Sequence, residues 1–286
     1  MTLTDAMSAG SRRGVGASFL NGESKQKRRA HAAVLDGCPS CIYCGGDLPA
    51  TTVDHVPPII MFAQRRRPKG LELGSCEPCN GGTKHADLVA AMVGRSLPDS
   101  GTDAGRAEMN GIFSAVNNNV PGLLKEMYLS REEQAVAGWR EQDGGLLRAN
   151  GPLVSSQMQT YAFKIGFSLY YELTKKVLPK TGGVVARWFS NVDRLDGTFP
   201  QSVFEHLLPP TTLRQGKFEV SDQFEYQWRL AEGERMAMFL ATFRRSFAVL
   251  AFAAVDRGML DTGTKQPFEI CAPGELTSIL HRENDW

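Results

Sequence analysis

The chain has 286 residues, of which 42% are hydrophobic and 22% are charged, a balance that is typical of a globular protein with a sizeable core. Its formal net charge is only +1, so any attraction to nucleic acid has to come from local groups of cations. Together these values exclude a fibrous protein and a strongly basic, histone-like binder.

The first 22 residues are rich in Ser, Gly and Thr and contain no long apolar run. We expect a flexible N-terminal segment there, with no signal peptide and no membrane-spanning helix, and hence a cytoplasmic protein. Residues 23–35 combine a group of cations with an alanine-rich apolar stretch, which favours a short helix. The cations are Lys25, Lys27, Arg28 and Arg29. They form either a solvated helix face or an arm that contacts phosphates.

Two Cys-x-x-Cys pairs follow, about thirty residues apart. The pairs are Cys41 with Cys44, and Cys76 with Cys79. Four thiolates at this spacing are the ligand set of a structural zinc ion, and reduced cytosolic thiols in this pattern are ligands more often than disulfides. Cys38 offers an alternative pair with Cys41. We prefer Cys41 and Cys44 because Gly45 follows them and permits the tight turn of a zinc knuckle, which leaves Cys38 as a spare thiol.

Between the cysteine pairs, residues 51–56 have the β-branched content of a strand, and Pro57 and Pro58 end it. The strand carries Asp54 and His55 to its end. Residues 71–73 are expected to form a second strand, and a helix is expected from Asn80 to about residue 95. The region is thus predicted to be a strand–strand–helix unit closed by the metal.

The loop between the two predicted strands contains four cations within five residues, Arg65, Arg66, Arg67 and Lys69. A solvated loop would explain them, but their position beside the strand that carries His55 favours contacts with a nucleic-acid backbone. Lys84, one turn after Asn80, either helps to neutralise phosphate or is simply exposed.

The Asp54-His55 pair on a strand and the Cys76-Glu77-Pro78-Cys79-Asn80 run at the start of a helix resemble the HNH endonucleases of the four-cysteine type. Those enzymes contain a ββα-metal unit, and the resemblance covers residues 38 to about 92. It implies that His55 is the general base and that Asp54 and Asn80 hold a catalytic Mg²⁺ or Mn²⁺ ion. It further implies that the four cysteines bind a separate, structural Zn²⁺.

The resemblance implies a metal-dependent endonuclease that hydrolyses phosphodiester bonds in DNA, most simply duplex DNA. One family feature is absent: the middle asparagine that orients the histidine is missing, since the corresponding stretch reads Gly70-Leu71-Glu72-Leu73. The alternative is a non-catalytic zinc-knuckle protein that binds nucleic acid. A homo-oligomer is left open.

The remainder of the chain, after turn-forming residues 98–102, is expected to be a separate domain over residues 98–286. The strongest predicted helix covers residues 155–178, and alternation over residues 224–230 indicates a half-buried strand. The apolar run 247–255 suggests a central strand or a buried helix. The predicted fold class is α+β: a zinc-stapled ββα-metal unit at residues 23–97, then helices to about residue 180 and antiparallel strands after them.

Overall fold

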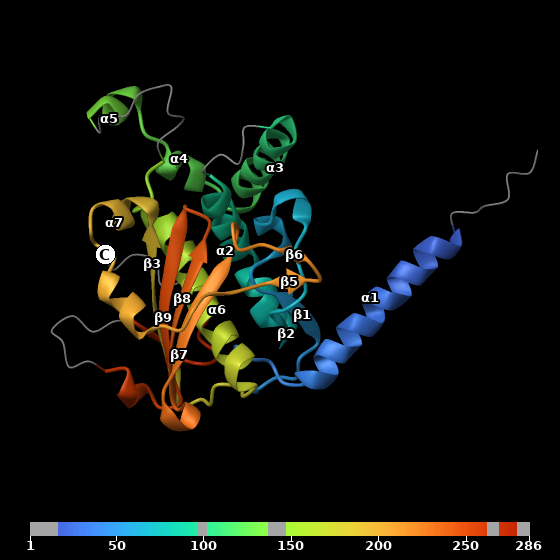
Figure 1. Ribbon diagram of the computed structural model, residues 1–286. Helices are drawn as coiled ribbons and strands as arrows, with labels where there is room; N and C mark the ends of the chain where they lie inside the picture. Colours follow the sequence, from blue (N-terminus) through green and yellow to red (C-terminus); the bar gives the residue numbers. More distant parts are fainter. Residues whose placement is uncertain (1–16, 97–101, 137–146, 262–268, 279–286) are drawn as a thin grey trace, which may run out of the picture.

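A computed structural model describes residues 17–96, 102–136, 147–261 and 269–278 of the chain. It contains both helices and antiparallel sheets (Figure 1), so the predicted α+β class is confirmed. None of the described helices is both long and apolar enough to cross a lipid bilayer.

The N-terminal part contains the predicted strand–strand–helix arrangement. Its elements are α1 (Ala17–Gly37), β1 (Thr52–His55), the 3₁₀ turns η1 (Ile59–Met61) and η2 (Ala63–Arg65), β2 (Glu72–Ser75) and α2 (Glu77–Arg95). β1 and β2 pair antiparallel, with His55 opposite Glu72. α2 begins directly after β2 because Pro78 lies in its first turn, where a missing N–H costs nothing.

Helix α1 differs from the prediction in length. It includes residues 17–22, which we expected to be flexible; residues 1–16 lie outside the described part. Every side chain from residue 25 to residue 30 is exposed, and α1 projects away from the rest of the described chain (Figure 1), although it contacts β1 and β2.

The body consists of further helices and a six-stranded sheet. The helices are α3 (Asp103–Asn119), α4 (Leu123–Met127), α5 (Arg131–Val136), α6 (Pro152–Thr174) and α7 (Asn191–Leu195), with 3₁₀ segments η4 (Gln201–His206), η5 (Glu232–Glu234) and η6 (Arg257–Met259). The strands are β3 (Gly183–Ser190), β4 (Thr211–Thr212), β5 (Arg214–Gln215), β6 (Phe218–Glu219), β7 (Glu225–Leu230), β8 (Met236–Phe243), β9 (Phe247–Ala254) and β10 (Ile270–Cys271). The sheet order is β10-β3-β9-β8-β7-β4, and β5 pairs separately with β6.

Strand β9 lies between β3 and β8, so the apolar run after residue 246 is a central strand and not a helix. Helix α6 packs on the sheet at close range: a side-chain carbon on Gly166 would lie 2.4 Å from Cγ1 of Val184. Only glycine permits this approach.

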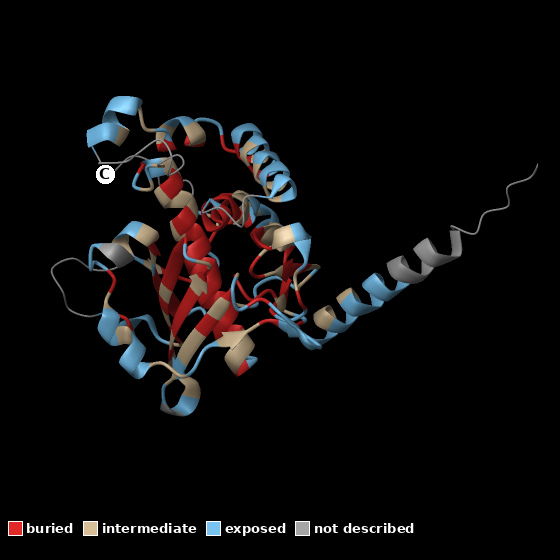
Figure 2. Cartoon of the chain, turned by 45° about the horizontal axis from the view of Figure 1, so that its top comes forward, coloured by how far each residue is buried: buried red, intermediate tan, exposed pale blue. Residues whose placement is uncertain are grey.

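Helix α6 also packs against α2, so it contacts both the N-terminal strand–strand–helix unit and the sheet. One hydrophobic cluster extends from Cys38 to Leu276 and includes side chains of all three parts. Figure 2 shows buried residues gathered along α6 and the sheet strands at the centre of the body, with two smaller clusters besides the main one. The domain boundary expected near residue 97 therefore does not divide the core, although the connecting residues 97–101 lie outside the described part.

Candidate metal centre and active site

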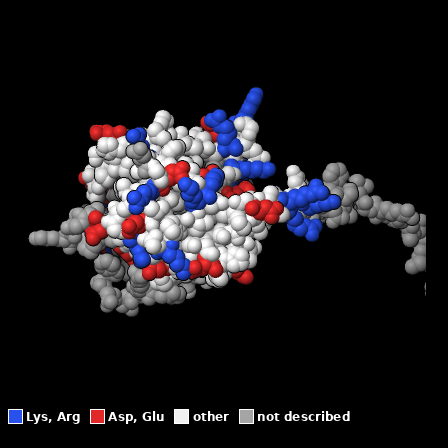
Figure 3. Space-filling view, turned by 90° about the horizontal axis from the view of Figure 1, so that it is seen from below, with Lys and Arg blue, Asp and Glu red and all other residues white. Residues whose placement is uncertain are grey.

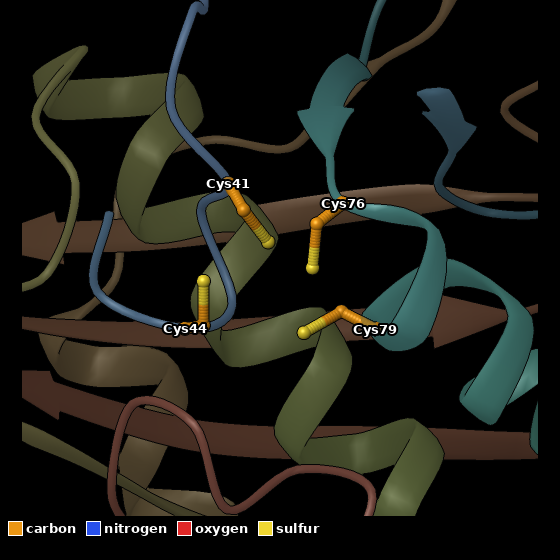
Figure 4. A group of neighbouring side chains, drawn as sticks. All are labelled: Cys41, Cys44, Cys76 and Cys79. Atoms are coloured by element: carbon orange, nitrogen blue, oxygen red, sulfur yellow. The ribbon is translucent and has the colours of Figure 1, made fainter. Parts of the chain in front are cut away.

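Four buried cysteines come together as predicted. Cys41 and Cys44 lie in the turn before β1, while Cys76 and Cys79 lie at the N-terminus of α2, and Figure 4 shows the four side chains pointing toward one another. Their sulfur atoms all lie within 4.8 Å of one another. The backbone after Cys44 has positive φ at Gly45 (70°) and Gly46 (83°), as a knuckle turn requires.

The electrostatics of the group favour a bound cation. A hydrogen bond from the Cys79 thiol lowers the pKa of Cys41 to about 4. The same hydrogen bond with Cys41 raises the pKa of Cys79. Four thiolates at this separation would repel one another without a cation between them. The cluster could hold a metal ion such as zinc, whose coordination by four cysteines is tetrahedral. Cys38 lies outside the group, with its thiol near the carbonyl oxygens of Ser40 and Gly74.

Asp54, expected as a ligand of the catalytic ion, is instead bound inside the protein. Its residue surface is 4% exposed. Its Oδ2 atom accepts a hydrogen bond from the Tyr43 hydroxyl at 2.8 Å and lies 2.8 Å from Nζ of Lys164. The carboxylate thus faces α6, and its negative charge is already paired with a buried lysine.

Lys164 is the centre of a buried charge cluster, which we define as Tyr43, Asp54, Asp87, Lys164 and Ser168. The ammonium group of Lys164 is completely buried and lies 2.7 Å from Oδ2 of Asp87. Desolvation raises the pKa of Asp87 to about 6, against the opposing effect of Lys164. Burial, followed by the charge of Asp54, raises the pKa of Tyr43, so its hydroxyl remains a hydrogen-bond donor.

The sequence contained one signal for this cluster that we did not use. Lys164 interrupts the apolar run of α6, where its neighbours Phe163 and Ile165 are both fully buried. A lysine with buried residues on both sides needs a counter-ion, because an unpaired buried ammonium is too costly. Its partners, however, are not identifiable without the fold.

His55 lies on the other side of β1, since successive side chains of a strand point in opposite directions. The residue is half-buried, and its ring centroid is 6.3 Å from that of His31 in α1. Desolvation lowers the pKa of His55, and the charge of Arg67 lowers it further. Its imidazole is therefore neutral at pH 7 and has a lone pair available.

Asn80 lies in the first turn of α2, where its Nδ2 atom donates to Oγ1 of Thr52 at 3.0 Å. No hydrogen bond joins Asn80 to Asp54 or His55 in the part of the chain that the structure describes. Among the described residues, the four cysteines are the only group of three or more His, Cys, Asp or Glu side chains that is arranged to hold a metal. The expected joint binding of an ion by Asp54 and Asn80 is thus not supported, because Asp54 is paired with Lys164.

Of the five cations expected to bind nucleic acid, Arg67 must be reassigned. Its side chain is 3% exposed, and its guanidinium donates to backbone oxygens within the loop. The acceptors are the carbonyl groups of Val56, Pro57, Pro68, Gly70 and Leu71. Arg67 holds the loop in shape and is not placed to contact a phosphate.

The other four cations, Arg65, Arg66, Lys69 and Lys84, are exposed. Figure 3 shows a further group of Lys and Arg side chains on α1, next to a body surface on which both signs of charge are mixed. Positive charge is therefore concentrated locally, as the small net charge requires.

Comparison of the chain with protein-family models, with curated proteins and with solved structures finds no match in any of the three. The functional argument therefore depends on the geometry of these residues.

Proposed function

We propose that the protein is a nuclease that hydrolyses phosphodiester bonds in DNA, with His55 as the general base and a structural zinc ion on the four cysteines. The observation that carries the proposal is the position of His55. This neutral, half-buried imidazole lies beside α1, which is basic, and on the strand that leads into the basic loop at residues 65–69.

The cations supply attraction for a phosphate backbone on both sides of the base. Lys27 precedes His31 by one helical turn and so lies on the same face of α1, the face nearest His55. Arg65 and Arg66 are exposed in the loop that follows β1. Cations in such positions contribute affinity for nucleic acid without reading its sequence.

At this place a neutral imidazole can take the proton of an attacking water, an effect worth roughly a hundredfold to ten-thousandfold in rate. The lowered pKa of His55 keeps the base unprotonated at more acidic pH than a free histidine, whose pKa is about 6.5. Cleavage should therefore persist to lower pH than it would with a histidine of ordinary pKa.

Of the two residues expected to bind a catalytic ion, only Asn80 remains a candidate. Its hydrogen bond to Thr52 uses the amide nitrogen, while a hard cation would bind the amide oxygen. Mg²⁺ keeps several waters and is held by few protein groups together with substrate phosphates. Whether cleavage needs Mg²⁺ or Mn²⁺ is part of the test.

The decisive experiment is plasmid nicking by the wild-type protein, with EDTA, Mg²⁺ or Mn²⁺, compared with His55→Ala. We expect His55→Ala to lower the cleavage rate at least about a hundredfold while DNA affinity stays within about twofold, since a base acts in the transition state. His206→Ala, at an exposed histidine of η4, is the matched control and should cleave normally. Equal rates for wild type and His55→Ala would overturn the proposal.

The second candidate is a zinc-knuckle protein that binds nucleic acid without cutting it. The pairing of Asp54 with Lys164 favours this function, because it removes one of the two expected ion ligands. This candidate predicts tight, salt-dependent DNA binding and no cleavage with any divalent ion. The same nicking experiment therefore separates the two.

A further inference from the structure

A β-hairpin of the body lies beside the basic loop. The β5–β6 hairpin leaves the sheet region and lies next to the zinc-stapled unit (Figure 1). Its base touches the end of the loop, because a side-chain carbon on Gly70 would lie 3.1 Å from Cδ2 of Leu213. At the start of the loop, the Ala63 N–H donates to Oε1 of Gln223 at 2.9 Å. The body thus fixes the loop at both ends.

Between the loop and the hairpin is a groove of about 320 Å³, lined by Arg66, Arg67, Gln215 and Phe218. This volume is at the lower end of the range of small-ligand sites. Phe218 is 43% exposed. Arg67 is engaged with backbone carbonyl groups, so the groups open to a partner are the aromatic ring of Phe218, the amide of Gln215 and the guanidinium of Arg66.

The charge of the groove is positive. The loop from residue 65 to residue 69 contains no carboxylate. Of the nearby carboxylates, Glu72 lies 3.9 Å from Nη1 of Arg67 and Glu219 is paired with Arg214, so the positive charge of the groove comes from Arg66. Among the residues that the structure describes, neither Arg66 nor Lys217 forms an ion pair with a carboxylate, and both are exposed. An anionic partner with an aromatic part suits these groups.

We propose that this groove binds an unpaired nucleotide of the nucleic-acid substrate, with the base stacked on Phe218 and its phosphate on Arg66. Gln215 supplies an amide that can hydrogen-bond to a base edge. A base inside a duplex is already stacked between its neighbours, so Phe218 can stack only on one that is unpaired. This inference rests on the proposed action on nucleic acid and extends the expected substrates from plain duplex to DNA that also carries a single-stranded segment.

Stacking on an aromatic side chain contributes about 5- to 150-fold in affinity per base. Phe218→Ala should therefore weaken binding of a fluorescently labelled oligothymidylate at least about fivefold, measured by anisotropy, and change binding of a blunt hairpin duplex less than about twofold. Phe218→Trp should restore single-strand binding. Phe204→Ala is the matched control, because Phe204 is 41% exposed in η4 and should affect neither substrate.

The groove proposal would be overturned if Phe218→Ala weakened the binding of both substrates equally, or weakened the binding of neither. Thermal unfolding of each variant checks that the hairpin change has not disturbed the fold. Loss of single-strand binding in a protein that never cleaves would uphold the groove and refute the nuclease. If cleavage required His55 but Phe218→Ala bound single strands as well as wild type does, the nuclease proposal would be upheld and the groove proposal refuted.

Discussion

Strand β1 has an inner side and an outer side that use adjacent residues of the chain for opposite purposes. On the inner side, Asp54 is buried against Lys164 of α6. On the outer side, His55 is half-buried beside α1. The loop after β1 shows the same contrast between neighbouring residues. The Arg67 side chain is buried and donates to carbonyl groups, while Arg66 is exposed in the groove.

The difference shows that polar residues next to each other in a motif need not share a task. Asp54 and Arg67 pair with other parts of the protein, whereas His55 is half-buried and Arg66 is exposed. The buried carboxylate of Asp54 and the buried guanidinium of Arg67 are engaged by groups of the protein itself, whereas the guanidinium of Arg66 is exposed, so burial decides which partners each group meets.

The largest expected effect comes from removing a cysteine ligand, which should disturb the inner and the outer side of β1 together. A structural zinc site contributes an apparent free energy of about 10–16 kcal/mol in zinc-finger peptides, so Cys79→Ser should unfold the N-terminal unit or make the protein insoluble. Metal analysis and thermal unfolding measure this. Cys38→Ser is the matched control, and it should keep one equivalent of zinc. A folded, zinc-free Cys79→Ser protein would show that the metal is dispensable.

The next effect concerns only the inner side. Lys164→Met leaves Asp54 and Asp87 buried without their cation and should cost about 3–5 kcal/mol in the free energy of unfolding. Because the folded-state pKa of Asp87 is raised to about 6, its contribution to stability is present at low pH and lost as pH rises through 6. Lys164 lowers the pKa of Asp87, so its removal raises this pKa further and makes ionisation of the buried carboxyl more costly. The variant should therefore lose more stability relative to wild type at pH 8 than at pH 5 in urea titrations.

Two further variants control this prediction. Lys176→Met removes an exposed ion pair with Glu234 and should cost no more than about 1 kcal/mol. Adding Asp54→Asn and Asp87→Asn to Lys164→Met should recover part of the loss, since no uncompensated charge remains. A Lys164→Met protein as stable as wild type would contradict the assigned role of the cluster.

The smallest effects come from the loop. Arg67→Ala should lower the free energy of unfolding by about 1.5–3 kcal/mol, because a charged donor is lost from several buried carbonyl groups. The Arg65→Ala/Arg66→Ala protein should unfold like wild type but bind DNA more weakly, with the salt slope reduced by about 0.9 per lost phosphate contact. DNA affinity measured at several salt concentrations and constant temperature tests this prediction. An unchanged slope of log affinity against log salt concentration would show that Arg65 and Arg66 do not contact phosphates.

The sequence predicted those features that depend on neighbours along the chain. The cysteine spacing, the glycine after Cys44 and the alternation that became β7 all act within a few residues, and the structure contains each of them. The environment of Asp54 was not predictable, because it depends on where a distant helix places one lysine. The β5–β6 hairpin was also missed, since strands of two residues show no periodicity.

The position of Lys164 has a consequence for the order in which the molecule can be completed. Lys164 follows its partner Asp87 by 77 residues, so during synthesis all four cysteines emerge from the ribosome well before the cation that neutralises Asp54 and Asp87. A nascent chain can bring its four cysteines together early. Until α6 has been synthesised, however, β1 and α2 present two carboxylates, those of Asp54 and Asp87, without a neutralising cation. We therefore expect that residues 23–97 cannot be transplanted as an independent module, and that α6 has to accompany them into any chimaera.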